Sequence, residues 1–334
     1  VNKGDNMNLS SLLIPAVLFF ALGFLAKLIK SDLKFPDGMA KGLSIFLLIG
    51  IGIKGGVALS QAEFLPALNS VLAALVLGFA TPILAFVWLN KLGKVGIFDS
   101  AAIAAHYGSV SAGTFLVAIA FLDSMGQTYE SYPLIMLAIM ESPAIIIGLL
   151  LAIYARSQMA KLNNNSDPES ISMKSLLHEA LTNGSVVLLL GAMLIAYLVP
   201  ADNLKSVIPF YKEMFMGVLS LFLLEMGMEA AKKINEFKKA GLVLITFGIT
   251  MPIVGALIGL VVAHYWLGFS IGGVFLVMVL AASASYIAVP PAMRMAIPEA
   301  NPSYYLTLTL GLTFPFNVVV GIPLYYHIAQ ALVG

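Results

Sequence analysis

The chain has 334 residues, of which 60% are apolar and only 10% are charged, and its formal net charge is +1. Soluble domains carry about 25% charged residues, so this composition excludes an ordinary soluble protein. The near-neutral charge gives no reason to expect nucleic-acid binding, and the lack of cysteine excludes disulfides, thiolate zinc sites and a cysteine nucleophile.

Apolar runs long enough to span a bilayer recur along the chain, and we expect ten membrane helices. In chain order they cover Leu9–Ala26, Lys41–Leu59, Leu65–Leu89, Phe98–Leu122, Tyr132–Ala155, Gly184–Val199, Pro209–Ala231, Ala240–Trp266, Ser270–Ala296 and Tyr304–Ala331. The first run lacks a small-x-small cleavage site, so we expect no cleaved signal peptide. The polar stretch 156–183 predicts a flexible linker between two sets of five helices.

Two of the expected helices contain a short stretch of small and hydroxyl-bearing residues. One is Tyr107-Gly-Ser-Val-Ser-Ala-Gly-Thr114, and the other is Ala281-Ala-Ser-Ala-Ser-Tyr286, which runs on to Pro290-Pro291. Inside a bilayer the backbone leaves a helix only where it is buried in protein or lines a cavity. Breaks at matching places in two halves therefore predict the binding site of a transporter. The alternative for either stretch alone is close packing of helices.

Four pairs of short matches relate the two halves. Gly52-Ile-Lys54 matches Gly227-Met-Glu229, Gly78 to Pro82 matches Gly248 to Pro252, Ser109-Val-Ser111 matches Ser283-Ala-Ser285, and Pro143 matches Pro315. The offsets are 175, 170, 174 and 172 residues, in the same order along the chain. Because each half has an odd number of spans, the second half must enter the membrane from the opposite side, which predicts an inverted repeat.

The distribution of Lys and Arg predicts the orientation. Fourteen of the eighteen basic residues flank the loops after the first, third, fifth, seventh and ninth helices. The positive-inside rule places these loops in the cytoplasm, so both termini are expected outside.

A few ionisable or polar residues fall within the expected spans. Glu141 is a candidate cation ligand or proton carrier, or alternatively a neutral acid that hydrogen-bonds to a backbone carbonyl. His106, next to the first break, is a packing residue or a proton relay. Thr309, Thr313 and Asn317 could supply oxygens, although helical hydroxyls often bond to their own backbone. No catalytic set of residues is present, so we do not expect an enzyme.

Several motifs resemble the sodium-dependent bicarbonate transporter family, the SbtA type of cyanobacteria. They are Gly108-Ser-Val-Ser-Ala-Gly-Thr114, Met140-Glu-Ser-Pro-Ala144, Met226-Gly-Met-Glu-Ala230, Ala281-Ala-Ser-Ala-Ser285, Pro290-Pro-Ala-Met-Arg294 and Ile297-Pro-Glu-Ala-Asn-Pro-Ser303. The resemblance covers nearly the whole chain. It implies a ten-helix carrier related in fold to bile-acid-type sodium symporters, in which a core domain moves against a gate domain as an elevator.

By this resemblance the two broken helices hold bicarbonate and sodium. The substrate-binding candidates are Gly108, Ser109, Ser111, Ala112, Thr114, Ser283, Ser285 and Tyr286, and the candidate sodium ligands are Ser109, Ser111, Glu141 and Ser283. The resemblance also implies a homotrimer in the bacterial inner membrane and a PII-like regulatory protein at the cytoplasmic face.

The chain departs from the family motif at three places. The family has an acidic residue where Tyr286 stands and an aspartate where Glu141 stands, and the linker 156–183 is shorter here. A tyrosine in place of a carboxylate removes a cation ligand or alters the substrate, and the short linker weakens the case for the regulatory partner.

The sequence thus predicts an all-α polytopic membrane protein of two inverted five-helix repeats, residues 9–155 and 184–332, joined by the linker 156–183. The expected function is sodium-coupled uptake of a small anion, bicarbonate first. The alternatives are a carrier of the same fold for another anion, a proton-coupled carrier, and a membrane sensor or scaffold that transports nothing.

Overall fold

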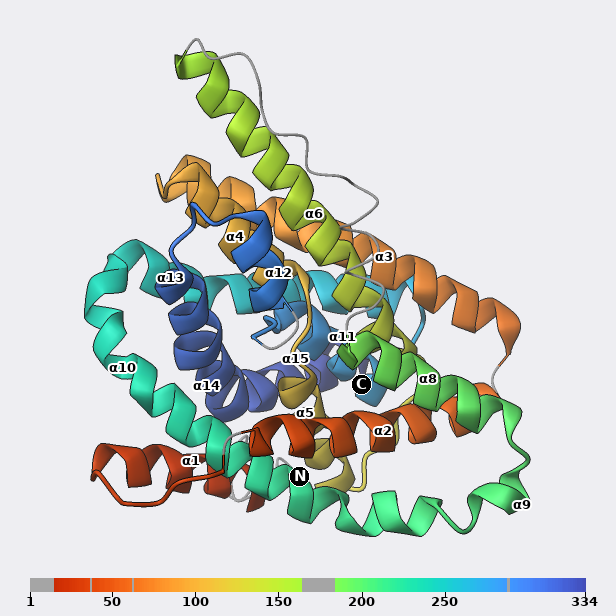
Figure 1. The fold of residues 1–334 in the computed structure, drawn as a ribbon. Helices are drawn as coiled ribbons and strands as arrows, with labels where there is room; N and C mark the ends of the chain where they lie inside the picture. Colours follow the sequence, from red (N-terminus) through yellow and green to blue (C-terminus); the bar gives the residue numbers. More distant parts are fainter. Residues whose placement is uncertain (1–14, 37, 62, 164–183, 287–288) are drawn as a thin grey trace, which may run out of the picture.

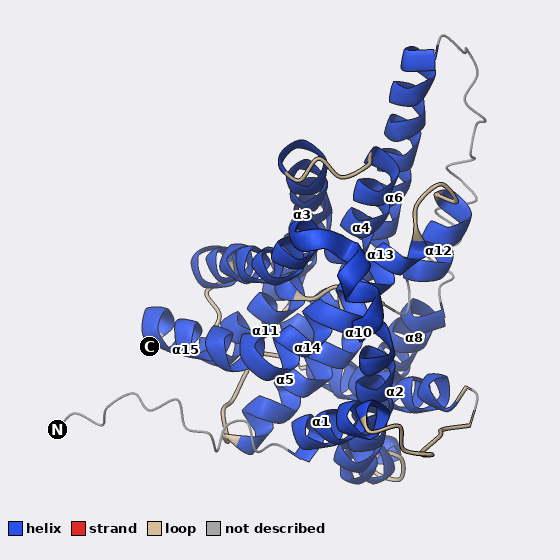
Figure 2. Cartoon of the chain, turned by 90° about the vertical axis from the view of Figure 1, so that its left-hand side faces the viewer, coloured by secondary structure: helices blue, strands red, loops and turns tan. Residues whose placement is uncertain are grey.

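The computed structural model describes residues 15–36, 38–61, 63–163, 184–286 and 289–334, and all regular structure in these ranges is helical (Figure 2). The helices are α1 (Pro15–Leu28), α2 (Met39–Leu59), α3 (Phe64–Val87), α4 (Ile97–Gly108), α5 (Ala112–Ser124), α6 (Tyr132–Asn163), α8 (Gly184–Leu198), α9 (Ala201–Leu204), α10 (Ile208–Val261), α11 (Ile271–Ala282), α12 (Val289–Ala296), α13 (Pro302–Leu306), α14 (Phe314–Phe316) and α15 (Ile322–Val333). Four π-helical segments adjoin them: η2 (Trp88–Leu92), η3 (Val262–Trp266), η4 (Thr307–Thr313) and η5 (Asn317–Gly321).

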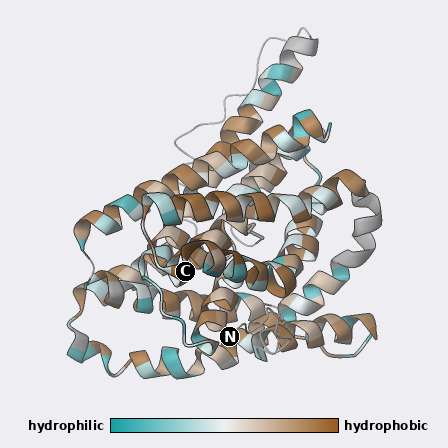
Figure 3. Ribbon diagram, turned by 180° about the vertical axis from the view of Figure 1, so that it is seen from behind, coloured by the Kyte–Doolittle hydropathy of each residue, from teal (hydrophilic) through white to brown (hydrophobic). Residues whose placement is uncertain are grey.

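The outer surface of the molecule is that of a membrane protein. Six helical segments within the described ranges are long and apolar enough to cross a bilayer. Apolar side chains also point outward: on α3 the residues Leu68, Leu72, Val76, Phe79 and Ile83 form an exposed stripe at three- to four-residue spacing. Figure 3 shows that apolar residues dominate most of the helices and that polar ones gather mainly near their ends and in the turns. Soluble monomers rarely expose apolar surface of this extent, so the stripe faces lipid or another subunit.

The helices form two groups that pack mainly within themselves. The first helix group comprises α1, α2, α8 and the part of α10 before residue 241, and α1 packs on α10 while α2 packs on α8 and α10. The second helix group comprises α3, α4, α5, α6, the rest of α10 and the helices that follow it. In Figure 1 the first group lies along the lower part of the view, and α3, α4 and α6 lie above it. Contacts between the groups are sparser than those within each group.

Glycine allows the closest backbone approach within the first helix group. A Cβ at Gly23 of α1 would overlap the carbonyl oxygen of Leu224 in α10, and a Cβ at Gly227 of α10 would overlap the carbonyl oxygen of Phe20 in α1. The two helices therefore cross with their backbones in direct contact. Small residues at helix crossings are the usual way for membrane helices to gain van der Waals packing where no hydrophobic effect drives them together.

The structure differs from the sequence-based expectation at two polar stretches. Residues 232–239, predicted as a loop, are helical and belong to α10. That helix is kinked at Gly241, where φ is +76°. Likewise α6 continues to Asn163, so the predicted linker is helical over residues 156–163, and residues 164–183 lie outside the described ranges. Lys, Glu, Ala and Leu are good helix formers, so these stretches remain helical although they are too polar to span a membrane.

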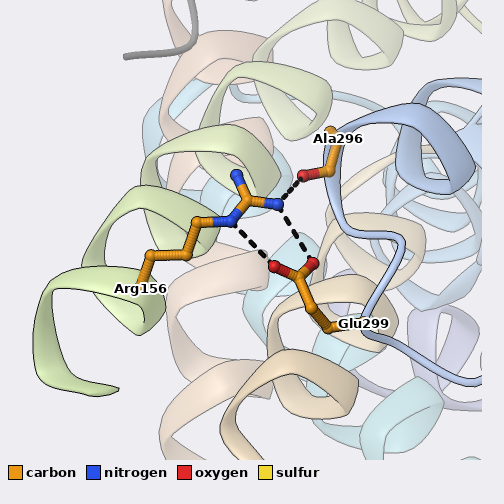
Figure 4. A network of polar contacts seen from close by, with 3 residues as sticks. All are labelled: Arg156, Ala296 and Glu299. Carbon is orange, nitrogen blue, oxygen red and sulfur yellow. Dashed lines mark hydrogen bonds and ion pairs between the residues drawn. The ribbon is translucent and has the colours of Figure 1, made fainter. Parts of the chain in front are cut away.

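Arg156 has a structural role that its place in the predicted linker did not suggest. Its guanidinium donates to both carboxylate oxygens of Glu299, at 2.9 and 3.0 Å, and to the carbonyl oxygen of Ala296 at 2.7 Å (Figure 4). These bonds connect α6 to the turn after α12. The hydrogen bonds from Arg156 hold the pKa of the Glu299 carboxyl below its usual value. This pair therefore stabilises the end of the second broken helix.

Candidate functional site

Both predicted breaks are present in the described structure. The first separates α4, which ends at Gly108, from α5, which begins at Ala112. The second follows the end of α11 at Ala282, and α12 begins at Val289, which places Pro290 in the first turn of that helix. Almost every residue of α5 and α11 is buried. The breaks are therefore enclosed by protein, as backbone outside a helix must be at membrane depth.

Two hydrogen bonds join the breaks to each other. The N–H of Ser111 donates to the hydroxyl oxygen of Ser283 at 2.9 Å. The N–H of Ser285 donates to the carbonyl oxygen of His106 at 2.9 Å. Segments from distant parts of the chain thus meet at one place and satisfy part of each other's free backbone groups.

The hydroxyls of Ser111 and Ser283 also maintain the local shape of the breaks. Ser111 is the N-cap of α5, where its side-chain oxygen accepts a hydrogen bond from the N–H of Thr114 at 3.1 Å. The Ser283 hydroxyl donates to the carbonyl oxygen of Leu280 at 2.9 Å, one turn back in α11. These two predicted sodium ligands are therefore engaged in hydrogen bonds within the protein: the Ser111 hydroxyl accepts one, and the Ser283 hydroxyl accepts one and donates one.

Asn317 supports the second break from behind. Its amide nitrogen donates to the carbonyl oxygen of Ala282, the last residue of α11, at 2.9 Å. Its amide oxygen accepts from the hydroxyl of Tyr325 at 2.9 Å. The sequence had suggested Asn317 as a source of oxygen ligands, whereas the structure places its nitrogen on the free end of a half-helix. Satisfying that buried carbonyl keeps the break open at low cost.

Three buried polar atoms at the first break have no hydrogen-bond partner among the described residues: Nε2 of His106, Oγ of Ser109 and Oγ1 of Thr114. The hydroxyl of Tyr286 also lacks a well-formed hydrogen bond, although it lies beside Ser111. A buried hydroxyl or imidazole nitrogen without a partner costs about 1–3 kcal/mol. Several together around one break indicate a place where a ligand or water supplies the missing bonds.

Ala112 and Tyr286 mark the accessible edge of this site. Both are half-buried, whereas Ser109, Ser111 and Thr114 are buried. The Tyr286 hydroxyl lies over the first turn of α5, since a Cβ at Gly113 would be 2.5 Å from it. The Tyr286 ring packs edge-on against Phe314, with 5.2 Å between the ring centroids. Tyr286 thus occupies the space at the start of α5 and restricts what can approach it.

Other predicted residues have different positions. A Cβ at Gly108 would be 2.5 Å from the ring of Pro82, so this glycine permits close packing of α4 on α3. The hydroxyl of Thr309 donates to the carbonyl oxygen of Tyr305, one turn back along the chain, at 2.8 Å. The hydroxyl of Thr313 donates to the carbonyl oxygen of Gly248, also at 2.8 Å. Ser285 is buried at the second break. The side chain of Glu141 lies outside the described part of the structure.

The arrangement favours an anion at one end and a cation at the other. The N–H groups of Ala112 and Gly113, at the start of α5, have no intrahelical partner and carry the positive end of the helix dipole. The last carbonyl groups of α4 and α11 carry the negative end. Among the described residues no cluster of three His, Cys, Asp or Glu side chains could hold a metal ion. Carbonyl and hydroxyl oxygens are the cation ligands that the described part of the site offers.

A sequence model of the Na+-dependent bicarbonate transporter superfamily matches residues 15–330, and the chain belongs to this family. No curated protein sequence matches the chain. Family membership makes the protein a multi-pass membrane transporter rather than an enzyme.

Proposed function

We propose that this member of the superfamily is a secondary active transporter that takes up a small anion, bicarbonate first, together with sodium. The observation that carries the proposal is the group of unpartnered buried polar atoms at the start of α5, above all Oγ of Ser109 and Oγ1 of Thr114. An oxyanion placed there would accept hydrogen bonds from these hydroxyls and from the free N–H groups of Ala112 and Gly113.

Sodium binds at the same crossing in this proposal. The carbonyl ends of α4 and α11, with the second lone pairs of Ser111 and Ser283, supply the hard oxygen ligands that such a cation prefers. Glu141 remains a proposed ligand on sequence grounds alone. Because the two charges would lie close together, each ion lowers the electrostatic cost of binding the other, and this mutual effect couples their transport.

The transport movement is proposed as a shift of the second helix group against the first. Sparse contacts between the groups and dense contacts within them favour such a movement. The inverted repeat of residues 9–155 and 184–332, the homotrimer, the bacterial inner membrane and the external termini remain part of this proposal. A PII-like partner would bind near residues 164–183, which lie outside the described structure.

A second candidate substrate is a different small anion. Tyr286 favours it, because a bulky neutral hydroxyl lies at the start of α5 where the family motif has an acidic residue. The tyrosine could donate a hydrogen bond to an anion that a carboxylate would repel. A thermal-shift screen of small anions against bicarbonate, with and without sodium, separates the two candidates, since the true substrate stabilises the protein in a sodium-dependent way.

Thr114→Val tests the site itself. The change removes an unpartnered hydroxyl and keeps the shape of the side chain, so folding is retained while anion affinity falls by about tenfold. Thr309→Val is the matched control, because within the described residues this buried hydroxyl bonds to the carbonyl oxygen of Tyr305, one turn back along the chain. Equal stabilisation of wild type and Thr114→Val by bicarbonate and sodium would contradict the proposed site.

A further inference from the structure

A cavity of about 430 Å³ lies between α2, α5 and α10, apart from the breaks. Of the two α5 residues that line it, Ile119 is the nearer to the first break, and it lies about 10 Å along the helix axis from Ala112. Most of the cavity wall is apolar, and the apolar side chains that line it include Ile53, Val57, Ile119, Ile208, Phe215 and Met216. The walls come from both helix groups, since α2 and this part of α10 belong to the first group and α5 belongs to the second.

Two lysines and one carboxylate line the same cavity. Nζ of Lys54 lies 3.8 Å from Oδ2 of Asp123, which is longer than a charge-assisted hydrogen bond of about 2.7–2.9 Å. Lys54 also donates to the hydroxyl of Tyr129 and lies 5.0 Å from the centre of that ring. Lys212 forms no ion pair with any described residue. Lys54, Lys212 and Asp123 together therefore carry a formal net charge of +1.

The size and lining of the cavity define its ligand. A bare inorganic anion would neutralise the surplus charge but would leave most of the apolar wall in contact with water. A ligand that adds an alkyl chain to the anionic head would bury that wall and gain the hydrophobic contribution as well. A neutral alkyl ligand would cover the apolar wall but would leave the surplus positive charge without a counter-ion.

We propose that this cavity binds an amphipathic monoanion, with a carboxylate or phosphate head between Lys54 and Lys212 and its alkyl chain against the apolar wall. Because its walls come from both helix groups, the bound ligand holds the groups together. Lys54 already connects them in the structure through Asp123 and Tyr129. If transport requires the groups to shift, as in the proposed function, the ligand inhibits transport without competing for the small-anion site.

Calorimetric titration with dodecanoate tests the binding site directly. The full chain in phosphatidylcholine nanodiscs is expected to bind dodecanoate saturably, and to bind dodecanol or acetate at least about tenfold more weakly. Replacing both lysines, Lys54→Met with Lys212→Met, is expected to weaken dodecanoate binding by a similar factor. Lys205→Met is the matched control, since this exposed lysine pairs with Asp202 and does not line the cavity.

Gly50→Leu provides a second variant that leaves the charges in place. A Cβ at Gly50 would make ordinary contacts of 3.5–3.7 Å with Phe215 and Tyr211, and a leucine side chain would fill part of the cavity. Loss of dodecanoate binding in this variant is the expected result. Binding that is unchanged in both Gly50→Leu and the double lysine variant, or equal binding of dodecanol, would overturn the proposal.

Two further measurements identify the source of the ligand and its effect on transport. Displacement of dodecanoate by phosphatidic acid in the nanodisc would make the natural ligand a lipid, and no displacement would make it a free carboxylate. Binding is measured without bicarbonate or sodium, so failure of the proposed transport function leaves this result intact. Uptake of dodecanoate itself would overturn the assignment, since the cavity would then belong to the transport path.

Discussion

The N–H of Ser111 donates to the hydroxyl of Ser283 over 2.9 Å, although 172 residues separate them in the chain. This bond joins the start of α5 to the end of α11, so each break positions the other. A buried N–H that loses its acceptor costs about 1–3 kcal/mol, because it keeps the full penalty of leaving water.

Ser283→Ala is therefore expected to lower the stability of the protein by an amount in that range. The N–H of Ser111 loses its acceptor, while the N–H of Ser283 still reaches Leu280. Thermal unfolding in detergent measures the effect. Ser70→Ala is the comparison, because in the described part of the chain the buried Ser70 hydroxyl bonds to the carbonyl of Pro66 in its own helix. Equal losses of Tm in the two variants would show that the bond between the breaks adds nothing.

Gly113→Ala is expected to disturb the site through Tyr286. The added Cβ would be 2.5 Å from the Tyr286 hydroxyl, so the tyrosine must move away from the start of α5. Combining the change with Tyr286→Phe removes the overlap, and a double-mutant cycle on anion binding should give a coupling of about 0.5–3 kcal/mol. Gly217→Ala, on an open face of α10, is the control and should leave binding unchanged. Additive effects of the two changes would contradict this contact.

Asn317→Leu is expected to destabilise the second break more than Tyr325→Phe does. The first change leaves both the carbonyl of Ala282 and the hydroxyl of Tyr325 without a partner, at about 1–3 kcal/mol each. The second leaves one group, the amide oxygen of Asn317, without its donor, at about 1–3 kcal/mol. The double variant should recover part of the loss, because no tyrosine hydroxyl then remains unpaired. Thermal unfolding of all three variants measures these effects. A double variant that recovers none of the lost stability would contradict the network.

The pair of Arg156 and Glu299 is expected to make stability depend on pH in the acid range. The pKa of Glu299 is lower in the folded protein than in the unfolded chain, because Arg156 hydrogen-bonds to the carboxylate. Its contribution is therefore complete above the unfolded pKa of about 4.3 and is lost as pH falls through the lower folded value. The Tm difference between wild type and Glu299→Gln should shrink over that interval. A constant difference down to the lowest accessible pH would contradict the ion pair.

The sequence was sufficient to locate the breaks. Clusters of Gly, Ser and Ala inside apolar segments indicated where a helix would end, and α4 and α11 end within those clusters. It was not sufficient to assign hydrogen bonds, since Ser109 and Ser111 look alike in sequence. In the structure the Ser109 hydroxyl has no partner among the described residues, whereas the Ser111 hydroxyl caps α5. Asn317 was similarly ambiguous until its amide was seen on Ala282.

The expected secondary structure is wrong at two polar stretches. Loops are the expectation at residues 156–163, in the polar linker, and at 232–239, between two expected spans, yet both stretches continue the adjoining helices. Polarity reports where a segment meets water, whereas helix propensity decides its conformation there. Nothing in the sequence pattern indicated the contacts that Lys54 and Arg156 make across the fold.

The most direct test of the transport site is uptake of radiolabelled bicarbonate into liposomes that contain the purified protein, with and without an inward sodium gradient. Wild-type protein is expected to show sodium-dependent uptake, and replacing both Ser111 and Ser285 by leucine in a folded protein is expected to abolish it. Uptake that is unchanged by these two substitutions, or that does not depend on sodium, would contradict a sodium-coupled anion site at the crossing of the two breaks.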